Sequence, residues 1–167
     1  MSLALPDAER LYDALVRHLS PLVNAQTGMV GIQTGGAWVA ERLHRDLGLV
    51  VPLGTLNISF YRDDYTSSGL HANVRPSRIP FDVNGRSLLL VDDVLFTGRT
   101  VRGAMNELFD YGRPESIGLV VLVDRGGRQL PICAQIVGAT LAVPPGAKLD
   151  LQRDAAGRLS LHLEEGA

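Results

Sequence analysis

The sequence predicts an α/β fold in which a central parallel sheet is flanked by helices. Residues 87–91 and 116–123 form continuous apolar runs, which are typical of parallel strands buried on both faces. Helical periodicity follows the first of these runs, and strands that alternate with helices assemble into parallel sheets. The chain has 167 residues, of which 46% are hydrophobic and 20% are charged. We therefore expect one globular domain spanning residues 1–167.

The first element is an amphipathic helix over residues 7–24. Four leucines recur there at spacings of four, four and three residues, which places them on one helical face. They are Leu11, Leu15, Leu19 and Leu22. We expect this face to cover the sheet.

A strand, a glycine loop and a second helix come next. Residues 29–33 are a short apolar run, and helical periodicity resumes at residue 37 and stops at Gly48. The loop between them consists of Thr34, Gly35 and Gly36. Because glycine has no Cβ, the backbone N–H groups of such a loop can approach an anion closely. A plain tight turn is the alternative interpretation.

The middle and the end of the chain carry less regular patterns. A predicted strand over residues 55–61 leads into a polar segment, residues 62–80, which has little periodicity. Loops of this length inside a compact domain are usually functional or disordered. Near the end, residues 148–151 and 159–163 flank a loop that contains Gly157, which predicts a terminal hairpin.

The most informative segment lies at the end of the apolar run 87–91. Asp92 and Asp93 follow that run, and open α/β sheets bind their ligands at the carboxyl ends of their strands. Two hydroxyls, a glycine and a cation then open a helix over residues 99–111, whose N-terminus favours a phosphate group. Carboxylates suit ribose hydroxyls or Mg²⁺. The layout therefore predicts a sugar-phosphate site, and an ordinary turn capped by one of the acids is the alternative.

Several classes of function are disfavoured by the sequence. It has neither the G-x-G-x-x-G dinucleotide motif after a strand nor a P-loop that ends in G-K-S/T. The net charge of −2 gives no general reason to expect nucleic acid as a partner. A signal-peptide pattern and a long apolar run are both missing, so we expect a cytoplasmic protein with no membrane partner. The only cysteine, Cys133, is predicted to be a reduced structural thiol at a buried strand edge.

Residues 87–100 resemble the phosphoribosyl-diphosphate (PRPP) signature of type I phosphoribosyltransferases. Three further strings look like the PyrR family of bifunctional pyrimidine-operon regulators and uracil phosphoribosyltransferases. They are F-Y-R-D-D at residues 60–64, D-Y-G-R-P at 110–114 and L-V-D-R-G-G-R-Q-L-P-I at 122–132. The resemblance implies the type I phosphoribosyltransferase fold, with the segment 62–80 as a flexible hood loop beside the C-terminal hairpin.

The same resemblance implies a reaction in which uracil and PRPP give UMP and diphosphate, with Mg²⁺ as cofactor. Asp92 and Asp93 would be the catalytic acids, which hold the ribose hydroxyls and, through PRPP, the metal. PRPP and UMP would be bound by Val94, Leu95, Phe96, Thr97, Gly98, Arg99 and Thr100, and by Thr34, Gly35 and Gly36 of the glycine loop. The hood-loop residues within reach of pyrophosphate would be Arg62, His71, Arg75 and Arg78. The nucleobase would lie against Val123, Asp124 and Arg125.

The sequence also bears on the choice of base and on the strength of PRPP binding. Purine-specific relatives often carry an acid where this chain has Phe96, which favours uracil over guanine and hypoxanthine. The family usually has Lys-Thr-Arg-Gly at the glycine loop, whereas Gln33 and Gly35 carry no charge here. Charge-assisted hydrogen bonds are the stronger ones, so we expect weaker PRPP binding or help from another cation.

The alternative function is an RNA-binding attenuator that senses uridine nucleotides. The family's regulators carry basic residues where this chain has Gly127 and Cys133. Contacts with phosphate supply much of the affinity for RNA. We therefore rank the enzyme above the regulator, and we expect a homodimer or a larger homo-oligomer.

Overall fold

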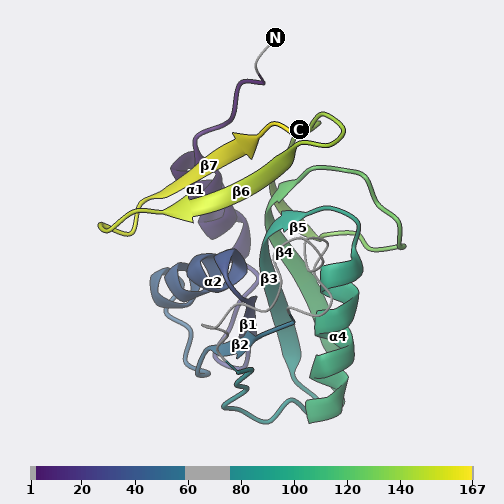
Figure 1. Ribbon diagram of the computed structural model, residues 1–167. Coiled ribbons are helices and arrows are strands. Elements are labelled where there is room, and N and C mark those ends of the chain that lie inside the picture. Colours follow the sequence, from purple (N-terminus) through teal and green to yellow (C-terminus); the bar gives the residue numbers. More distant parts are fainter. Residues whose placement is uncertain (1–2, 59–75, 167) are drawn as a thin grey trace.

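The computed structural model describes residues 3–58 and 76–166 of the chain. The sheet strands are β1 (Gly28–Ile32), β2 (Gly54–Leu56), β3 (Ser87–Leu95), β4 (Ser116–Asp124) and β5 (Ile136–Thr140). The helices are α1 (Ala8–Leu19), α2 (Gly35–Asp46) and α4 (Arg99–Tyr111), and β6 (Lys148–Arg153) pairs with β7 (Leu159–Glu164). The five strands are parallel and lie in the order β2-β1-β3-β4-β5 (Figure 1). The predicted fold class and terminal hairpin are thus confirmed.

Alternating residues of the sheet contribute to two hydrophobic cores. Helices α1 and α2 cover one face together with the hairpin, and α4 covers the other face (Figure 1). The first core contains Met29, Val91 and Val120, and the second contains their sequence neighbours Val30, Leu90 and Val121. Because successive side chains of a strand point to opposite faces, each central strand is apolar along the part that lies between the two cores.

The order of the strands creates a ligand crevice at a defined place. The chain passes from β1 outward to β2 and then returns to add β3 on the other side of β1. The direction of winding therefore changes between β1 and β3. In open α/β sheets the ligand binds at this point, outside the carboxyl ends of the strands. The glycine loop follows β1 and the acidic pair lies on β3, so both predicted loops flank the crevice.

Helix α1 is shorter than predicted. Asp7 caps it by accepting a hydrogen bond from the Glu9 N–H at 2.9 Å, and Leu15 and Leu19 are fully buried. The helix ends at Leu19 because Pro21 has no N–H with which to continue the ladder. The side chain of Leu22 is therefore 62% exposed, and its predicted place on the buried face is wrong.

Two strand boundaries and the burial of Cys133 also differ from the prediction. Strand β2 ends at Leu56, and part of the predicted strand 55–61 lies outside the described residues. Strand β3 continues through Asp92 and Asp93 to Leu95, because Asp92, Val94 and Leu95 still pair with β4. Cys133 is exposed and precedes β5, so its predicted burial at a strand edge is wrong. The chain around it loops over the surface between β4 and β5 instead of pairing.

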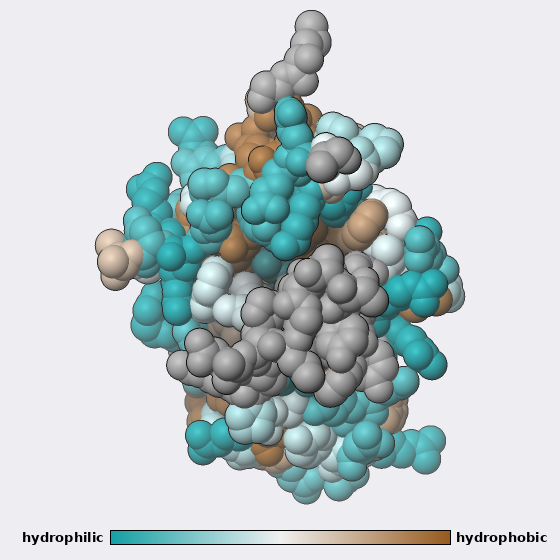
Figure 2. Space-filling view, viewed as in Figure 1, coloured by the Kyte–Doolittle hydropathy of each residue, from teal (hydrophilic) through white to brown (hydrophobic). Residues whose placement is uncertain are grey.

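Figure 2 shows the character of one face of the molecule. On the face drawn in Figure 2, most of the coloured residues are hydrophilic, and hydrophobic ones show between them in limited areas. In the part of the chain that the structure describes, no helix has the length and apolarity required to cross a membrane.

A polar cluster ties the terminal hairpin to the two helices beneath it. The Arg42 guanidinium donates two hydrogen bonds of 2.9 Å to the Glu9 carboxylate and lies 4.0 Å from the centre of the Tyr12 ring. Glu9 also accepts a 2.7 Å hydrogen bond from the N–H of Leu159 in β7. One carboxylate therefore links α1, α2 and the hairpin. The hydrogen bond from Arg42 is the main reason that the pKa of Glu9 lies below its usual value.

We expect Glu9→Gln to lower the free energy of unfolding at neutral pH by roughly 1–2 kcal/mol, because it breaks a partly buried ion pair. Because the pKa of Glu9 is lower in the folded protein than in the unfolded chain, the charged carboxylate stabilises the fold at pH values above the unfolded pKa of about 4.3. This stabilisation is lost as the pH falls through the pKa of Glu9 in the folded protein. The difference in the free energy of unfolding between wild type and Glu9→Gln should therefore become smaller at acid pH. Urea unfolding at several pH values measures it, with Asp13→Asn on the exposed face of α1 as control. A gap that does not change with pH would contradict this account.

Candidate functional site

The glycine loop and the acidic pair are in direct contact at the carboxyl edge of the sheet. Gly35 and Gly36 form the first turn of α2, two residues before the start that periodicity suggests, and both are buried. A Cβ at Gly36 would lie 2.6 Å from the carbonyl oxygen of Val91 and 2.9 Å from the Cα of Asp92. A Cβ at Gly35 would overlap the carboxylate of Asp93. Only glycine therefore lets α2 begin this close to β3.

The two acids have different surroundings. Asp92 is only 6% exposed, and its carboxylate accepts a hydrogen bond from the N–H of Asp93 at 2.9 Å. Asp93 is half-buried, and its carboxylate accepts from the N–H of Val94 at 2.8 Å. Asp93 is thus the acid that lies beside the glycine loop and is more accessible to a ligand.

The segment after β3 turns into α4 through a left-handed glycine. Gly98 has a φ of 93° and stands at the cap position of α4, where a side chain would also meet Ile132. The hydroxyl of Thr97, a residue only 4% exposed, accepts a hydrogen bond from the N–H of Arg99 at 3.2 Å. The positive end of the α4 dipole therefore lies at this turn, which is the arrangement that binds phosphate.

The chain after β4 braces this turn. The Arg128 guanidinium donates hydrogen bonds to the carbonyl oxygens of Phe96 at 2.6 Å and Ile132 at 2.8 Å. It also pairs with the carboxylate of Asp124 at 2.5 Å. The backbone N–H of Gln129 donates to the Thr97 carbonyl oxygen at 2.9 Å. The string R-G-G-R thus holds the turn between β3 and α4 in place.

The predicted base side lies next to the turn. The register of β3 and β4 sets Leu95 opposite Asp124. The Arg125 guanidinium lies 3.9 Å from the centre of the Phe96 ring and donates a hydrogen bond to the Ala147 carbonyl oxygen at 3.0 Å. Gly127, with a φ of 75°, packs against the edge of the same ring. Phe96 is thereby fixed between two parts of the loop that follows β4.

The structure brings most of the predicted site residues to one edge of the sheet. The side chains of Leu95 and Val123 are buried in the hydrophobic cores, so their contact with a ligand would come from the backbone alone. Thr34 is exposed, and the peptide bond before it is cis. The predicted hood-loop residues Arg62, His71 and Arg75 lie outside the described residues.

Some residues at this edge escape prediction from sequence. Gln129 accepts a hydrogen bond from the Arg99 side chain at 3.0 Å as well as contacting Thr97. Trp38 and Arg153 line a cavity to which Gln33 and Thr34 also contribute. No local motif marks Trp38 or Arg153, and the string 122–132 gives no role to Gln129, because these contacts join distant parts of the chain.

The acidic pair fits Mg²⁺ that is carried mainly by a phosphorylated ligand. Hard cations prefer oxygen, and Asp92 and Asp93 offer carboxylates at the crevice. Among residues 3–58 and 76–166, no group of three or more His, Cys, Asp or Glu is placed to hold a metal ion. Two carboxylates supply too few ligands for a metal cage, so most ligands would come from the bound molecule.

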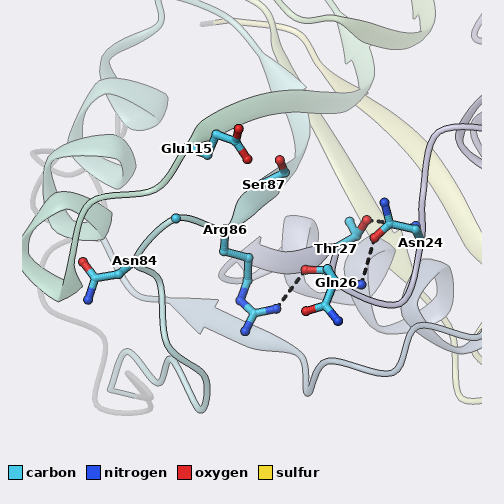
Figure 3. Close-up of a pocket in the computed structure, with 8 residues that line it drawn as sticks. Asn24, Gln26, Thr27, Asn84, Arg86, Ser87 and Glu115 are labelled. Atoms are coloured by element: carbon cyan, nitrogen blue, oxygen red, sulfur yellow. Dashed lines mark hydrogen bonds between the residues drawn. The ribbon is translucent and has the colours of Figure 1, made fainter.

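Another cavity lies at the opposite, amino-terminal end of the sheet (Figure 3). Its volume is about 380 Å³, and Asn84 and Glu115 are among the residues that line it. The Arg86 guanidinium donates hydrogen bonds of 2.8 Å to the carbonyl oxygens of Gln26 and Asp82. Arg86 thus joins the loops that precede β1 and β3. None of the predicted site residues that the structure describes lines this cavity.

Comparison with known proteins identifies a family model and curated relatives. The model of the phosphoribosyl transferase domain matches residues 7–141. Bifunctional protein PyrR from Pseudomonas aeruginosa (strain LESB58) is 55% identical over 134 residues, which are 80% of this chain and 79% of the relative. Bifunctional protein PyrR from Nitrosococcus oceani is 52% identical over 149 residues, which are 83% of this chain and 84% of the relative.

Solved structures share the same fold. A hypoxanthine-guanine phosphoribosyltransferase from Bacillus anthracis superposes with a TM-score of 0.65 at 17% identity, covering 88% of both chains. The enzyme from Leishmania tarentolae, solved with GMP, gives a TM-score of 0.62 at 18% identity, covering 82% of this chain and 79% of that one. At such low identity the similarity establishes the phosphoribosyltransferase fold and nothing about the base.

Proposed function

The chain belongs to the PyrR family of phosphoribosyltransferases, and from this premise we propose that it transfers the phosphoribosyl group of PRPP to uracil. The products are UMP and diphosphate. The observation that carries the proposal is the contact between the glycine loop and Asp93, next to the helix N-terminus at Gly98. These groups suit the pyrophosphate, the ribose and the 5′-phosphate of one PRPP molecule.

Each part of the site has a distinct role in this reaction. The N–H groups and hydroxyls of Thr97, Gly98, Arg99 and Thr100 bind the 5′-phosphate. Asp92 and Asp93 hold the ribose hydroxyls, and the backbone of the glycine loop faces the pyrophosphate. The bond from C1 of PRPP to the pyrophosphate oxygen breaks as the bond to N1 of uracil forms, so positive charge develops on the sugar. The proton of uracil N1–H passes to solvent, and diphosphate leaves. Bound Mg²⁺ supplies charge neutralisation of the departing diphosphate. Positioning and electrostatics therefore provide most of the catalysis.

The site gives one reason to favour a pyrimidine base. Phe96 presents an apolar ring where an acid would suit a purine ring nitrogen, and Arg125 and Gly127 hold that ring in place. Val123, Asp124 and Arg125 follow on the neighbouring strand, with the backbone of Val123 available to the base. These contacts support uracil as the accepted base.

Regulation through RNA is the second candidate function, because the relatives are named bifunctional. The arginines of the R-G-G-R string are poor candidates for RNA contacts here. Arg128 binds two backbone carbonyls and Asp124, and Arg125 stacks on Phe96. Gly127 and Cys133 add no charge. These contacts support the enzyme over the regulator, and tight UMP-dependent binding of a pyrimidine leader RNA at physiological salt would reverse the ranking.

We propose in addition that residues 1–167 act as a single phosphoribosyltransferase domain. The hairpin lies beyond the matched residues 7–141, yet it packs on α1 and is tied to α1 and α2 through Glu9. Assembly into a homodimer or larger homo-oligomer remains a prediction, which light scattering of the purified chain tests.

Conversion of labelled uracil into UMP tests the proposed function. With PRPP and Mg²⁺ present, we expect UMP to form from uracil, and guanine and hypoxanthine to be rejected. Omission of PRPP is the control. Nucleotide formation from guanine under conditions where uracil gives none would overturn the assignment of the base.

A further inference from the structure

Gly127 lies against the aromatic ring of Phe96, in the loop that follows β4. Its φ of 75° falls in the left-handed region. A Cβ at Gly127 would lie 2.5 Å from Cε2 and 2.9 Å from Cδ2 of Phe96, and the third-nearest atom belongs to the same ring. Carbon atoms in favourable contact are about 3.5–4.0 Å apart. Any other residue at this position would therefore displace the ring or the loop.

The ring of Phe96 is held from two further directions. The Arg125 guanidinium covers its face, 3.9 Å from the ring centre. The carbonyl oxygen of Phe96 accepts a 2.6 Å hydrogen bond from Arg128, which also pairs with Asp124 at the end of β4. The backbone that carries the ring is thus fastened to the neighbouring strand. A side chain at position 127 would have to turn the ring about its own side-chain bonds, away from its contact with Arg125.

Phe96 lies where a base would meet the sugar-phosphate part of the proposed site. It directly precedes Thr97 of the turn into α4, and β3 ends beside β4 where Leu95 pairs with Asp124. A planar base can pack on an aromatic ring, and such contacts prefer particular offset or edge-to-face arrangements. The orientation of the Phe96 ring therefore decides how well a base fits.

We propose that Gly127 is a positioning residue for the uracil base, which acts by leaving Phe96 in the orientation that packs on the base. The inference rests on the proposed function and deepens it. Gly127 makes no contact with the base in this account. Its contribution is the space that a Cβ would fill, so its effect depends on Phe96.

Gly126→Ala is a matched control for Gly127→Ala. Gly126 has a φ of 71°, and a Cβ there would meet no atom within 4 Å. Alanine is strained to a similar degree at both positions, because both have left-handed backbone, so thermal unfolding should show similar losses of stability. Only the substitution at Gly127 places an atom against the Phe96 ring.

Calorimetric titrations of the whole chain with UMP and with ribose 5-phosphate, which has no base, test this assignment. We expect Gly127→Ala to weaken UMP binding about three- to tenfold, the size of an aromatic packing contribution, and to leave the affinity for ribose 5-phosphate unchanged. The KM for uracil should rise similarly, and the KM for PRPP should not change. Gly126→Ala should leave all four quantities at their wild-type values.

Two further variants test whether the effect passes through Phe96. In Phe96→Ala the ring is absent, so adding Gly127→Ala should cause no further loss of UMP affinity. Gly127→Asn introduces the same Cβ in a residue type that tolerates left-handed backbone, and it should weaken UMP as Gly127→Ala does. The asparagine variant therefore gives the same test if the alanine variant does not fold.

The outcomes separate this inference from the proposed function. Equal UMP affinity in the variants of Gly126 and Gly127 would overturn the role of Gly127. A parallel loss of affinity for ribose 5-phosphate, or a further loss in the double variant with Phe96→Ala, would also overturn it. Failure of the wild type to make UMP from uracil would overturn the proposed function, while the titrations, which need no turnover, still report on Gly127.

Discussion

Asp93→Asn is expected to lower the kcat/KM for uracil transfer by roughly 10- to 100-fold, the effect of losing a hydrogen bond to a charged group. Asparagine has nearly the same shape and retains an oxygen that can accept the N–H of Val94, so the fold should persist. The substitution removes the negative charge that faces the glycine loop, which we assign to the ribose hydroxyls and, through PRPP, to Mg²⁺. Steady-state kinetics and UMP calorimetry measure the two consequences.

The control for this substitution is Asp110→Asn. Asp110 is exposed on α4, outside the crevice, so the same change of charge there should leave transfer and UMP affinity unaltered. If Asp93→Asn also left both quantities at the wild-type level, the assignment of the acidic pair would be wrong.

The adjacent glycines of α2 should respond differently to alanine. At Gly36 the added Cβ would meet the backbone of Val91 and Asp92, which cannot rotate away, so we expect a loss of about 1–3 kcal/mol in the free energy of unfolding. At Gly35 it would meet the Asp93 carboxylate, which can rotate away. Gly35→Ala should therefore remain folded, helped by the better helix propensity of alanine, while uracil transfer falls about as far as in Asp93→Asn.

Thermal unfolding and kinetics on this pair separate stability from catalysis. Because α2 begins so close to β3, we expect Gly36→Ala to lower chiefly the temperature of the unfolding midpoint. We expect Gly35→Ala to lower chiefly the rate of uracil transfer. Equal stability and full activity in both variants would show that α2 does not begin against the acidic pair.

Elements with strong local signals could be predicted from the sequence. The apolar runs identify β3 and β4 because central parallel strands are buried on both faces. The helix over residues 99–111 has the predicted bounds, since Gly98 opens it and Gly112 ends it. The apolar run that precedes Asp92 and Asp93 also predicts that both acids lie near the carboxyl end of a strand, and the structure places them in the last part of β3. Their role in a ligand site stays a prediction.

Features that depend on tertiary contacts could not be predicted. The strand β3 extends through the acidic pair because it pairs with β4 there. Helix α2 begins early because Gly36, which has no Cβ, lets the helix approach the backbone of Val91. The placement of Arg78 depends on a single bridge to Thr55, which no periodicity reveals. The error at Cys133 has the same origin, because only the fold shows that the chain there loops over the surface.

Competition between UMP and PRPP tests most directly the central claim that the glycine loop and residues 92–100 form one nucleotide site. In calorimetric titrations with Mg²⁺, we expect saturating UMP to suppress the binding of PRPP, because both ligands place a 5′-phosphate on the N–H groups of residues 97–100. Independent binding of UMP and PRPP, with unchanged affinity for each in the presence of the other, would contradict the account.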